Sequence, residues 1–289
     1  SGWAQGRFHY ASGWLYVAHS ANTVSRYRVG DHTAAGSSFD PSTTMTRLID
    51  PTAAATTTTG ADGDPYVTAA VEAIGGMTIT IDNDTPASNI GIKKVVANNY
   101  WEVIGADDIT IKFSSDSVQG NGDKNASPRT GPWFWYVIIE FAGTISDDMV
   151  KMSAGGNKGI KLETIGSKAT IKVNSTMINL SDSSTSGGVS LSFKDNWSVG
   201  AKYLIAASKN VSGRNTAYLG TLSESTPGKG LEVRSTGQFL VDDFDNLDPA
   251  EFQLEFKAGT KIYEIGYLRG EADRSLIEDL FTRGKTLIA

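Results

Sequence analysis

Hydrophobic and polar positions alternate with a two-residue period through most of the chain beyond residue 89. Their apolar runs are short and are bounded by turns rich in Asn, Asp, Ser and Gly. Strand centres follow one another at roughly 8–12 residues, the spacing of an all-β sandwich. The pattern predicts strands at residues 90–96, 101–104, 109–113, 133–141, 149–153, 159–164, 169–173, 177–180, 189–193, 202–207, 216–222, 231–235, 252–256 and 262–267.

The period changes near the end of the chain. Residues 262–267 alternate as in a strand with one buried face, whereas Ala272, Leu276, Leu280 and Phe281 follow at helical spacing. Charged residues between 273 and 278 occupy the other face of that helix. We therefore expect a final strand and a short amphipathic helix that closes the domain.

These final residues resemble the last strand and closing turn of laminin-G and concanavalin-A-like sandwich domains. The resemblance rests on Ile262, Glu264, Ile265, Tyr267, Arg269, Ser275, Ile277 and Glu278. The run WFWYVIIEF at residues 133–141 resembles the first buried strand of such domains, and residues 203–207 and 214–220 resemble their central hairpin. The resemblance implies a concanavalin-A-like jelly roll over residues 89–289, and it implies a fold more than an activity.

The first 88 residues differ from the rest in composition. They contain all three histidines and no lysine. Short aromatic strands are predicted at residues 7–10, 14–17 and 23–29. We expect a small β unit here, separate from the sandwich, that docks on a partner or on a second copy of the chain.

An extended arm is predicted to follow these strands. Residues 31–63 are dominated by Thr, Ala, Ser, Gly and Asp, which bury too little apolar surface to stay compact alone. Residues 65–75 allow a short helix, and residues 77–81 alternate as a strand. The domain boundary is therefore expected between residues 88 and 89.

Charge and composition exclude several classes of function. The net charge is −6 and the basic residues are scattered, which argues against a nucleic-acid partner. The absence of Cys excludes disulfides, thiolate metal sites and cysteine nucleophiles. Because no apolar run approaches the length of a membrane span, we expect no membrane partner.

One acidic cluster has the ligand chemistry of a calcium site. Asp242, Asp243, Asp245 and Asp248, with Asn246 among them, offer the hard oxygen ligands that calcium prefers. Laminin-G-like domains often hold calcium at a rim loop, so the resemblance favours the same reading. The alternative is a solvated Asp-rich turn, because the spacing does not match an EF-hand.

A second set of residues suits a glycan ligand. The rings of Trp135 and Trp197 could stack on pyranose faces, and Asn196 and Arg214 could supply hydrogen bonds. The alternative places the tryptophans in the core, with Trp197 as a core anchor beside a turn.

Catalytic motifs find little support. The sequence has neither an HExxH metal motif nor a G-x-S-x-G nucleophile elbow. Residues 255–259 resemble the F-K-x-G-x-Y strand of jelly-roll alginate lyases, with Lys257 and Tyr263 in the roles of uronate ligand and acid–base group. The sandwich half contains no His to neutralise the uronate, which argues against a lyase. We expect no enzymatic activity and no cofactor other than the calcium considered above.

Composition suggests a setting for the protein. The first ten residues lack the apolar core of a signal peptide. A chain with extracellular-looking composition and no export signal suits a virion component of a bacterial virus. The expected function is a non-enzymatic capsid-decoration or tail-associated protein that binds other virion proteins or itself, with a lectin-like sandwich for cell-surface glycans. The alternative is a secreted carbohydrate-binding or polysaccharide-lyase-like module.

Overall fold

The chain divides into two compact units. The structure is a computed structural model, and it describes residues 8–11, 14–20, 23–28, 39–45, 47–71, 73–74, 78–82, 84–105, 108–113, 133–145, 149–154, 160–165, 168–174, 189–210, 214–223, 231–238, 253–268 and 270–289. Unit 1 is Ser1–Phe39 and unit 2 is Asp40–Ala289. The predicted boundary after residue 88 is corrected by this division, because strands before residue 88 pair with strands after it.

Unit 1 contains a three-stranded antiparallel sheet in the order β1, β2, β3. Its strands are β1 (Phe8–Ala11), β2 (Trp14–Ser20) and β3 (Thr23–Arg28). Neighbouring strands pair in sequence, as in a meander. The three strands predicted in this stretch are confirmed.

Unit 2 is built from antiparallel strands that form one hydrogen-bonded system. In chain order its strands are β4 (Arg47–Ile49), β5 (Ala55–Thr59), β6 (Pro65–Val71), β7 (Thr78–Asp82), β8 (Gly91–Val95), β9 (Tyr100–Ile104), β10 (Ile109–Phe113), β11 (Trp133–Phe141), β12 (Val150–Ala154), β13 (Ile160–Ile165), β14 (Lys168–Asn174), β15 (Val189–Asn196), β16 (Lys202–Lys209), β17 (Arg214–Thr221), β18 (Leu231–Gln238), β19 (Gln253–Phe256) and β20 (Thr260–Leu268). Short 3-10 turns η1 (Pro41–Thr43), η2 (Pro86–Ser88) and η3 (Val96–Asn98) lie between them, and α3 (Arg274–Leu287) closes the chain.

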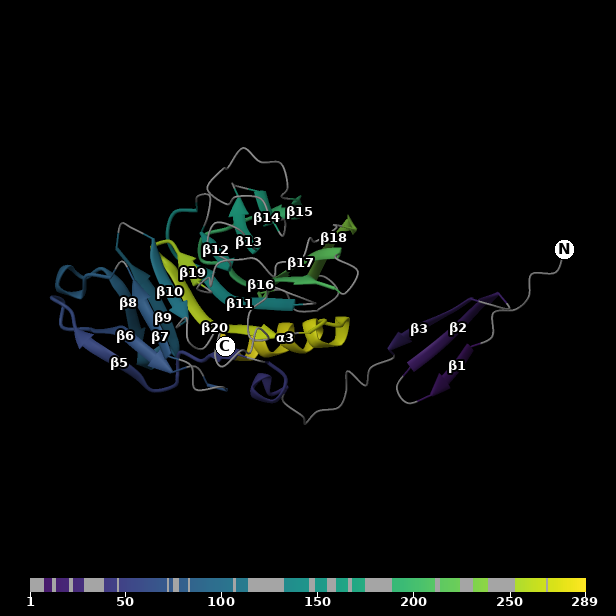
Figure 1. Cartoon of the computed structure of the whole chain (residues 1–289), viewed down its shortest axis with the longest axis horizontal. Helices are drawn as coiled ribbons and strands as arrows, with labels where there is room; N and C mark the ends of the chain where they lie inside the picture. Colours follow the sequence, from purple (N-terminus) through teal and green to yellow (C-terminus); the bar gives the residue numbers. More distant parts are fainter. Residues whose placement is uncertain are drawn as a thin grey trace, which may run out of the picture. The chain divides into compact units, whose positions relative to one another are not determined.

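The strands of unit 2 form two layers. The first layer has the order β18, β17, β16, β11, β20, with β9 and β4 both pairing with β20. The second layer has the order β7, β10, β19, β12, β13, β14, β15. Strands β8 and β6 link β9 to β7, so the sheet folds over onto itself (Figure 1).

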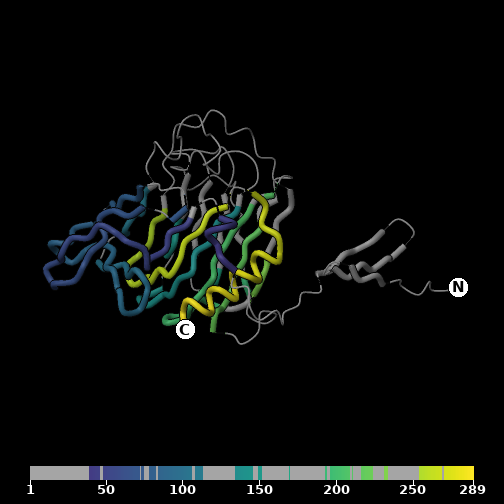
Figure 2. The backbone as a smooth tube through the Cα atoms, turned by 90° about the horizontal axis from the view of Figure 1, so that it is seen from below, coloured from purple at the N-terminus to yellow at the C-terminus, as the bar shows by residue number. Residues whose placement is uncertain are grey.

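The core lies between these layers. Alternate residues of β11 (Trp135, Val137, Ile139 and Phe141) join Ile109 and other apolar residues of the second layer in one cluster. The intervening residues of β11 are also buried, because α3 covers the outer face of the first layer. Figures 1 and 2 show α3 lying along this face. A strand buried on both faces accounts for the nearly continuous apolar run WFWYVIIEF.

Helix α3 packs as its sequence pattern predicts. The side chain of Asp273 accepts a hydrogen bond from the backbone N–H of Leu276 at 2.8 Å and so caps the first turn. The apolar face of the helix is buried at Leu276, Ile277, Leu280 and Phe281. The predicted closing helix is therefore confirmed.

Two local predictions are corrected. Residues 55–59 of the expected arm form β5, and residues 65–71 of the expected short helix form β6. The β-branched Thr run favours a strand once a partner is present, and β6 has β5, β7 and β8 as partners. Backbone hydrogen bonds to neighbouring strands thus order these stretches although they contain few large apolar residues.

The all-β sandwich itself is confirmed, with strands at nearly every predicted position of residues 89–289. The strand predicted at residues 177–180 lies outside the described residues. None of the helices in the described part of the chain combines the length and the apolar character that crossing a bilayer requires.

Candidate functional site

A row of alternating charges crosses the outer face of the first layer and continues onto β8. Strand register places Lys202 of β16 opposite Glu140 of β11, and Glu140 opposite Lys261 of β20. Lys261 in turn lies opposite Glu102 of β9, which lies opposite Lys93 of β8. Directly opposed residues share one face of a sheet, so the five side chains form a line. We call these residues the charge row.

Glu140 is the most buried residue of this row. Its Oε1 accepts a hydrogen bond from Lys261 Nζ at 2.8 Å, and its Oε2 accepts one from the Tyr263 hydroxyl at 3.1 Å. The Glu140 side chain is 11% exposed and that of Lys261 is 21% exposed. Burial alone lowers the pKa of Lys261, but the hydrogen bond to Glu140 and nearby negative charge leave it above its usual value. Lys261 therefore stays protonated over the physiological pH range.

Two tyrosines flank the charge row. The rings of Tyr100 and Tyr263 lie 5.4 Å apart between centroids. Lys261 Nζ lies 5.3 Å from the Tyr100 ring centroid, and Lys202 Nζ lies 5.7 Å from that of Tyr263. Tyr263 is buried whereas Tyr100 is partly exposed, so Tyr100 is the aromatic group that a ligand can reach.

A β-bulge gives Tyr263 its position. The register of β11 and β20 shifts between Ile138, which faces Glu264, and Ile139, which faces Ile262. Tyr263 is therefore the extra residue, and both Tyr263 and Glu264 lie on the outer face while Ile262 and Ile265 lie in the core. Bulges redirect side chains in this way next to functional sites.

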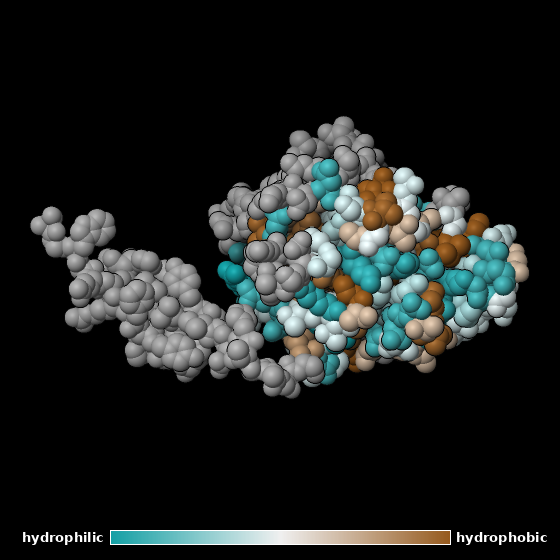
Figure 3. All heavy atoms as spheres, turned by 180° about the vertical axis from the view of Figure 1, so that it is seen from behind, coloured by the Kyte–Doolittle hydropathy of each residue, from teal (hydrophilic) through white to brown (hydrophobic). Residues whose placement is uncertain are grey.

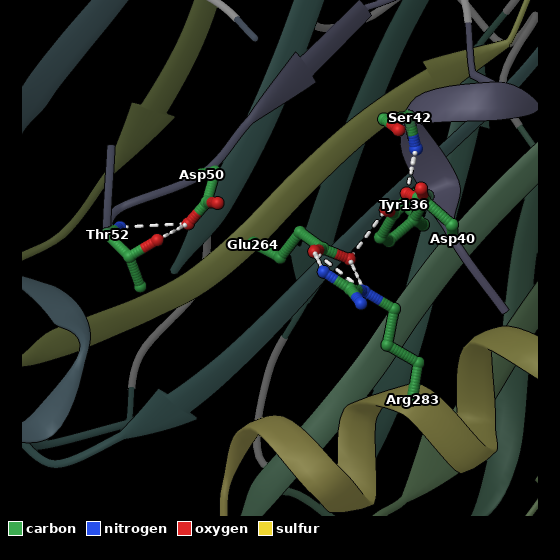
Figure 4. A network of polar contacts seen from close by, with 7 residues as sticks. All are labelled: Asp40, Ser42, Asp50, Thr52, Tyr136, Glu264 and Arg283. Atoms are coloured by element: carbon green, nitrogen blue, oxygen red, sulfur yellow. Dashed lines mark hydrogen bonds and ion pairs between the residues drawn. The ribbon is translucent and has the colours of Figure 1, made fainter. Parts of the chain in front are cut away.

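A second polar cluster on the same face is structural. Arg283 of α3 donates two hydrogen bonds to Glu264 from Nε, at 3.0 and 2.8 Å, and one from Nη2 at 2.5 Å. The Tyr136 hydroxyl donates to Glu264 Oε1 at 2.7 Å. Figure 4 shows Tyr136 and Arg283 converging on this carboxylate from β11 and α3. Because the Glu264 side chain is 1% exposed, the cluster fastens the helix and leaves little room for a ligand.

The predicted glycan-binding residues do not form one surface. Trp135 is fully buried and Trp197 is 5% exposed. Trp197 packs edge-on against Phe141 and Tyr203, with centroids 5.4 and 5.1 Å away. These positions correct the predicted stacking role, because core rings cannot offer a face to a sugar. Asn196 is exposed at the end of β15.

The remaining predicted site residues cannot be placed. The backbone of Arg214 begins β17, but its side chain lies outside the described residues. Asp242, Asp243, Asp245 and Asp248, the predicted calcium ligands, also lie outside them. Within the described part of the chain, no group of three or more His, Asp or Glu side chains is placed to hold a metal ion.

The lyase arrangement is not assembled. Lys257 follows β19 of the second layer, where its charge acts on Asp108, whereas Tyr263 lies on the outer face of the first layer. Burial and the charge of Glu140 raise the pKa of Tyr263 well above its usual value. A phenol that holds its proton so firmly is a poor general base at neutral pH.

Sequence patterns did not predict the charge row, because only the strand register brings its residues together. Glu140 and Lys261 are far apart in sequence, and no local spacing connects them. One signal was present, since Glu140 is the charged residue of the otherwise apolar run at residues 133–141. A charged residue in such a run usually has a partner.

One face of the molecule is mixed in polarity. On the face shown in Figure 3, hydrophobic residues form separate patches between hydrophilic ones. Large continuous apolar areas are typical of protein and membrane contact sites.

Comparisons with known proteins identify the fold. No family model matches the sequence, and a search of curated proteins gives no match. Solved structures that are similar include the binding domain of botulinum neurotoxin DC in complex with rat synaptotagmin II, at 9% identity, and the binding domain of botulinum neurotoxin serotype D, at 10% identity, both with a TM-score of 0.50. They cover 85% and 84% of this chain, which spans about half of theirs, 52% in each case. The likeness shows an all-β antiparallel sandwich, the fold that the sequence predicts.

Proposed function

We propose that this chain is a non-enzymatic binding module whose ligand is a glycan, bound at the charge row and Tyr100. The observation that carries the proposal is the partly exposed Tyr100 ring beside Glu140, Lys261 and Glu102. Aromatic faces stack on sugar rings, and carboxylates and ammonium groups hydrogen-bond to hydroxyls.

The scaffold supports this assignment. The row lies on paired strands, and Glu140 is held by two hydrogen bonds, so the polar groups are already oriented before a ligand arrives. Glu140 Oε1 and Oε2 each have further acceptor capacity for a ligand hydroxyl. The neurotoxin structures with the same fold are themselves binding domains, one of them in complex with synaptotagmin II.

A second proposal concerns what the module is attached to. We propose that unit 1 attaches the sandwich to a virion, or to a second copy of the chain, as a capsid-decoration or tail-associated protein. Its support is compositional: the small aromatic sheet at Phe8–Arg28 precedes a Thr-rich segment. A secreted carbohydrate-binding module is the alternative, and calcium at residues 242–248 remains a prediction.

One experiment tests the binding function. The purified chain is run through native gels that contain neutral or acidic polysaccharides, with calcium or with a chelator, while the same mixtures are monitored for unsaturated sugar products. We expect retardation by at least one polysaccharide and no product absorbance. Growing absorbance would show a lyase, and unchanged mobility in every gel would remove the glycan-binding function.

A further inference from the structure

Lys202 lies at one end of the charge row and has no carboxylate within ion-pair distance in the described part of the chain. Its Nζ donates to the backbone oxygen of Ile288 at 3.0 Å and faces the Tyr263 ring. Glu140, which lies opposite Lys202, already accepts hydrogen bonds from Lys261 and Tyr263. An ammonium group has three donors, so Lys202 retains capacity for a further acceptor.

The surroundings of Lys202 select the charge of that acceptor. The residue is half-buried against a tyrosine ring, where a charge interacts more strongly with a counter-ion than it does in water. Glu140 and Glu102 in the same row repel groups of high negative charge such as phosphates. A single carboxylate satisfies both conditions.

We propose that the ligand is a glycan bearing a carboxylate, as in a uronic acid, with Lys202 pairing with that carboxylate. This inference rests on the proposed function of the charge row. Tyr100 stacks on the sugar ring, Glu102 accepts a hydrogen bond from a hydroxyl, and the sugar carboxylate lies at the Lys202 end. Charge-assisted hydrogen bonds of this kind contribute strongly to specificity.

The test compares matched polysaccharides that differ only in charge. Pectate and hyaluronate are used beside their carboxyl-reduced forms, and dissociation constants are measured for the whole chain by affinity electrophoresis. We expect the acidic form of a retained polysaccharide to bind about tenfold more tightly than its reduced form. Lys202→Met should remove that preference, so that the acidic and reduced forms bind this variant equally, whereas Lys202→Arg should retain the preference.

Lys94→Met is the matched control. Lys94 Nζ also donates to a backbone oxygen, that of Ala53 at 2.6 Å, and Lys94 is next to Lys93 on β8 and so points to the opposite face. Lys94→Met removes one positive charge, as Lys202→Met does, and should not change the preference for the acidic polysaccharide. Thermal unfolding followed by circular dichroism establishes that each variant is folded.

The two proposals fail in different ways. Equal binding of acidic and reduced polysaccharides, unaffected by Lys202→Met, would overturn the carboxylate assignment and leave glycan binding intact. A preference that Lys94→Met reduces as much as Lys202→Met would also overturn it, because net charge would then be the cause. Failure of every acidic and reduced form to bind would overturn the glycan-binding function together with this inference.

Discussion

Arg283 on α3 and Glu264 on β20 form an ion pair beneath the helix, with the Arg283 side chain 25% exposed and the Glu264 side chain 1% exposed. Tyr136 is the other hydrogen-bond donor to this carboxylate (Figure 4). The pair joins the last element of the chain to the strand at the centre of the first layer. Removing one partner of a buried pair leaves an uncompensated charge, which costs more than the pair itself contributes.

Arg283→Met should therefore lower the free energy of unfolding by about 3 kcal/mol, toward the low end for a buried pair because Arg283 is partly exposed. Adding Glu264→Gln should recover part of the loss, since a neutral amide needs no counter-charge. Urea unfolding followed by circular dichroism measures both changes.

The control for this prediction is Arg274→Met on the same helix. Arg274 is 88% exposed and pairs with Glu278 one turn away. Such pairs change stability by about 0.5 kcal/mol or less. Equal losses in Arg283→Met and Arg274→Met would contradict the structural role of the buried pair.

Gly266 is placed where a side chain has no room. A Cβ atom there would lie 2.0 Å from Cε1 and 2.5 Å from Cζ of Tyr136, whose position is fixed by its hydrogen bond to Glu264. Gly266→Ala should lower the free energy of unfolding by about 2 to 3 kcal/mol through overpacking. Gly200→Ala is the comparison: its Cβ would meet nothing within 4 Å, and its φ of 75° should cost about 1 kcal/mol. A smaller loss for Gly266→Ala than for Gly200→Ala would contradict the packing described.

Buried tyrosines should make the protein sensitive to alkali. Burial and a hydrogen bond to Asp62 raise the pKa of Tyr66 to about 12, and burial also raises those of Tyr136 and Tyr263. The folded state retains these protons, whereas the unfolded state loses them near pH 10. The contribution of these tyrosines to the free energy of unfolding is therefore fully present below pH 10 and is lost as the pH rises toward 12.

Each such tyrosine should contribute a slope of up to about 1.4 kcal/mol per pH unit in that window. Urea unfolding at several values between pH 9 and pH 12 measures how the free energy of unfolding depends on pH. Tyr66→Phe should reduce that slope by the contribution of one tyrosine. The difference between the two proteins isolates Tyr66 from the lysines that titrate nearby. Identical slopes would show that Tyr66 titrates normally in the folded state.

Local patterns predicted most of the fold. Short apolar runs bounded by turns placed β11 and β16 correctly, alternation placed β20, and helical spacing placed α3. The failures occurred where pairing decides structure. Residues 65–71 carry Ala and Val at spacings that fit a helix, but three neighbouring strands hold them as β6.

The sequence did not predict the candidate site, and the reason is related. Aromatic residues were read as ligand groups, yet Trp135 and Trp197 are the rings that fill the core. The charge row depends on strand register, and a shift of one residue would move each of its side chains to the other face. The bulge at Tyr263 alters the register within β20 itself, and alternation in the sequence does not reveal it.

The measurement that tests the central claim most directly compares the affinities of Tyr100→Ala and Tyr218→Ala for a polysaccharide that retards the unaltered chain. Tyr218 is a second partly exposed tyrosine of the first layer, in contact with Phe134 and away from the charge row. Loss of a stacked ring should weaken binding about tenfold or more in Tyr100→Ala, with Tyr218→Ala unchanged. Full affinity in Tyr100→Ala would contradict a glycan site at the charge row.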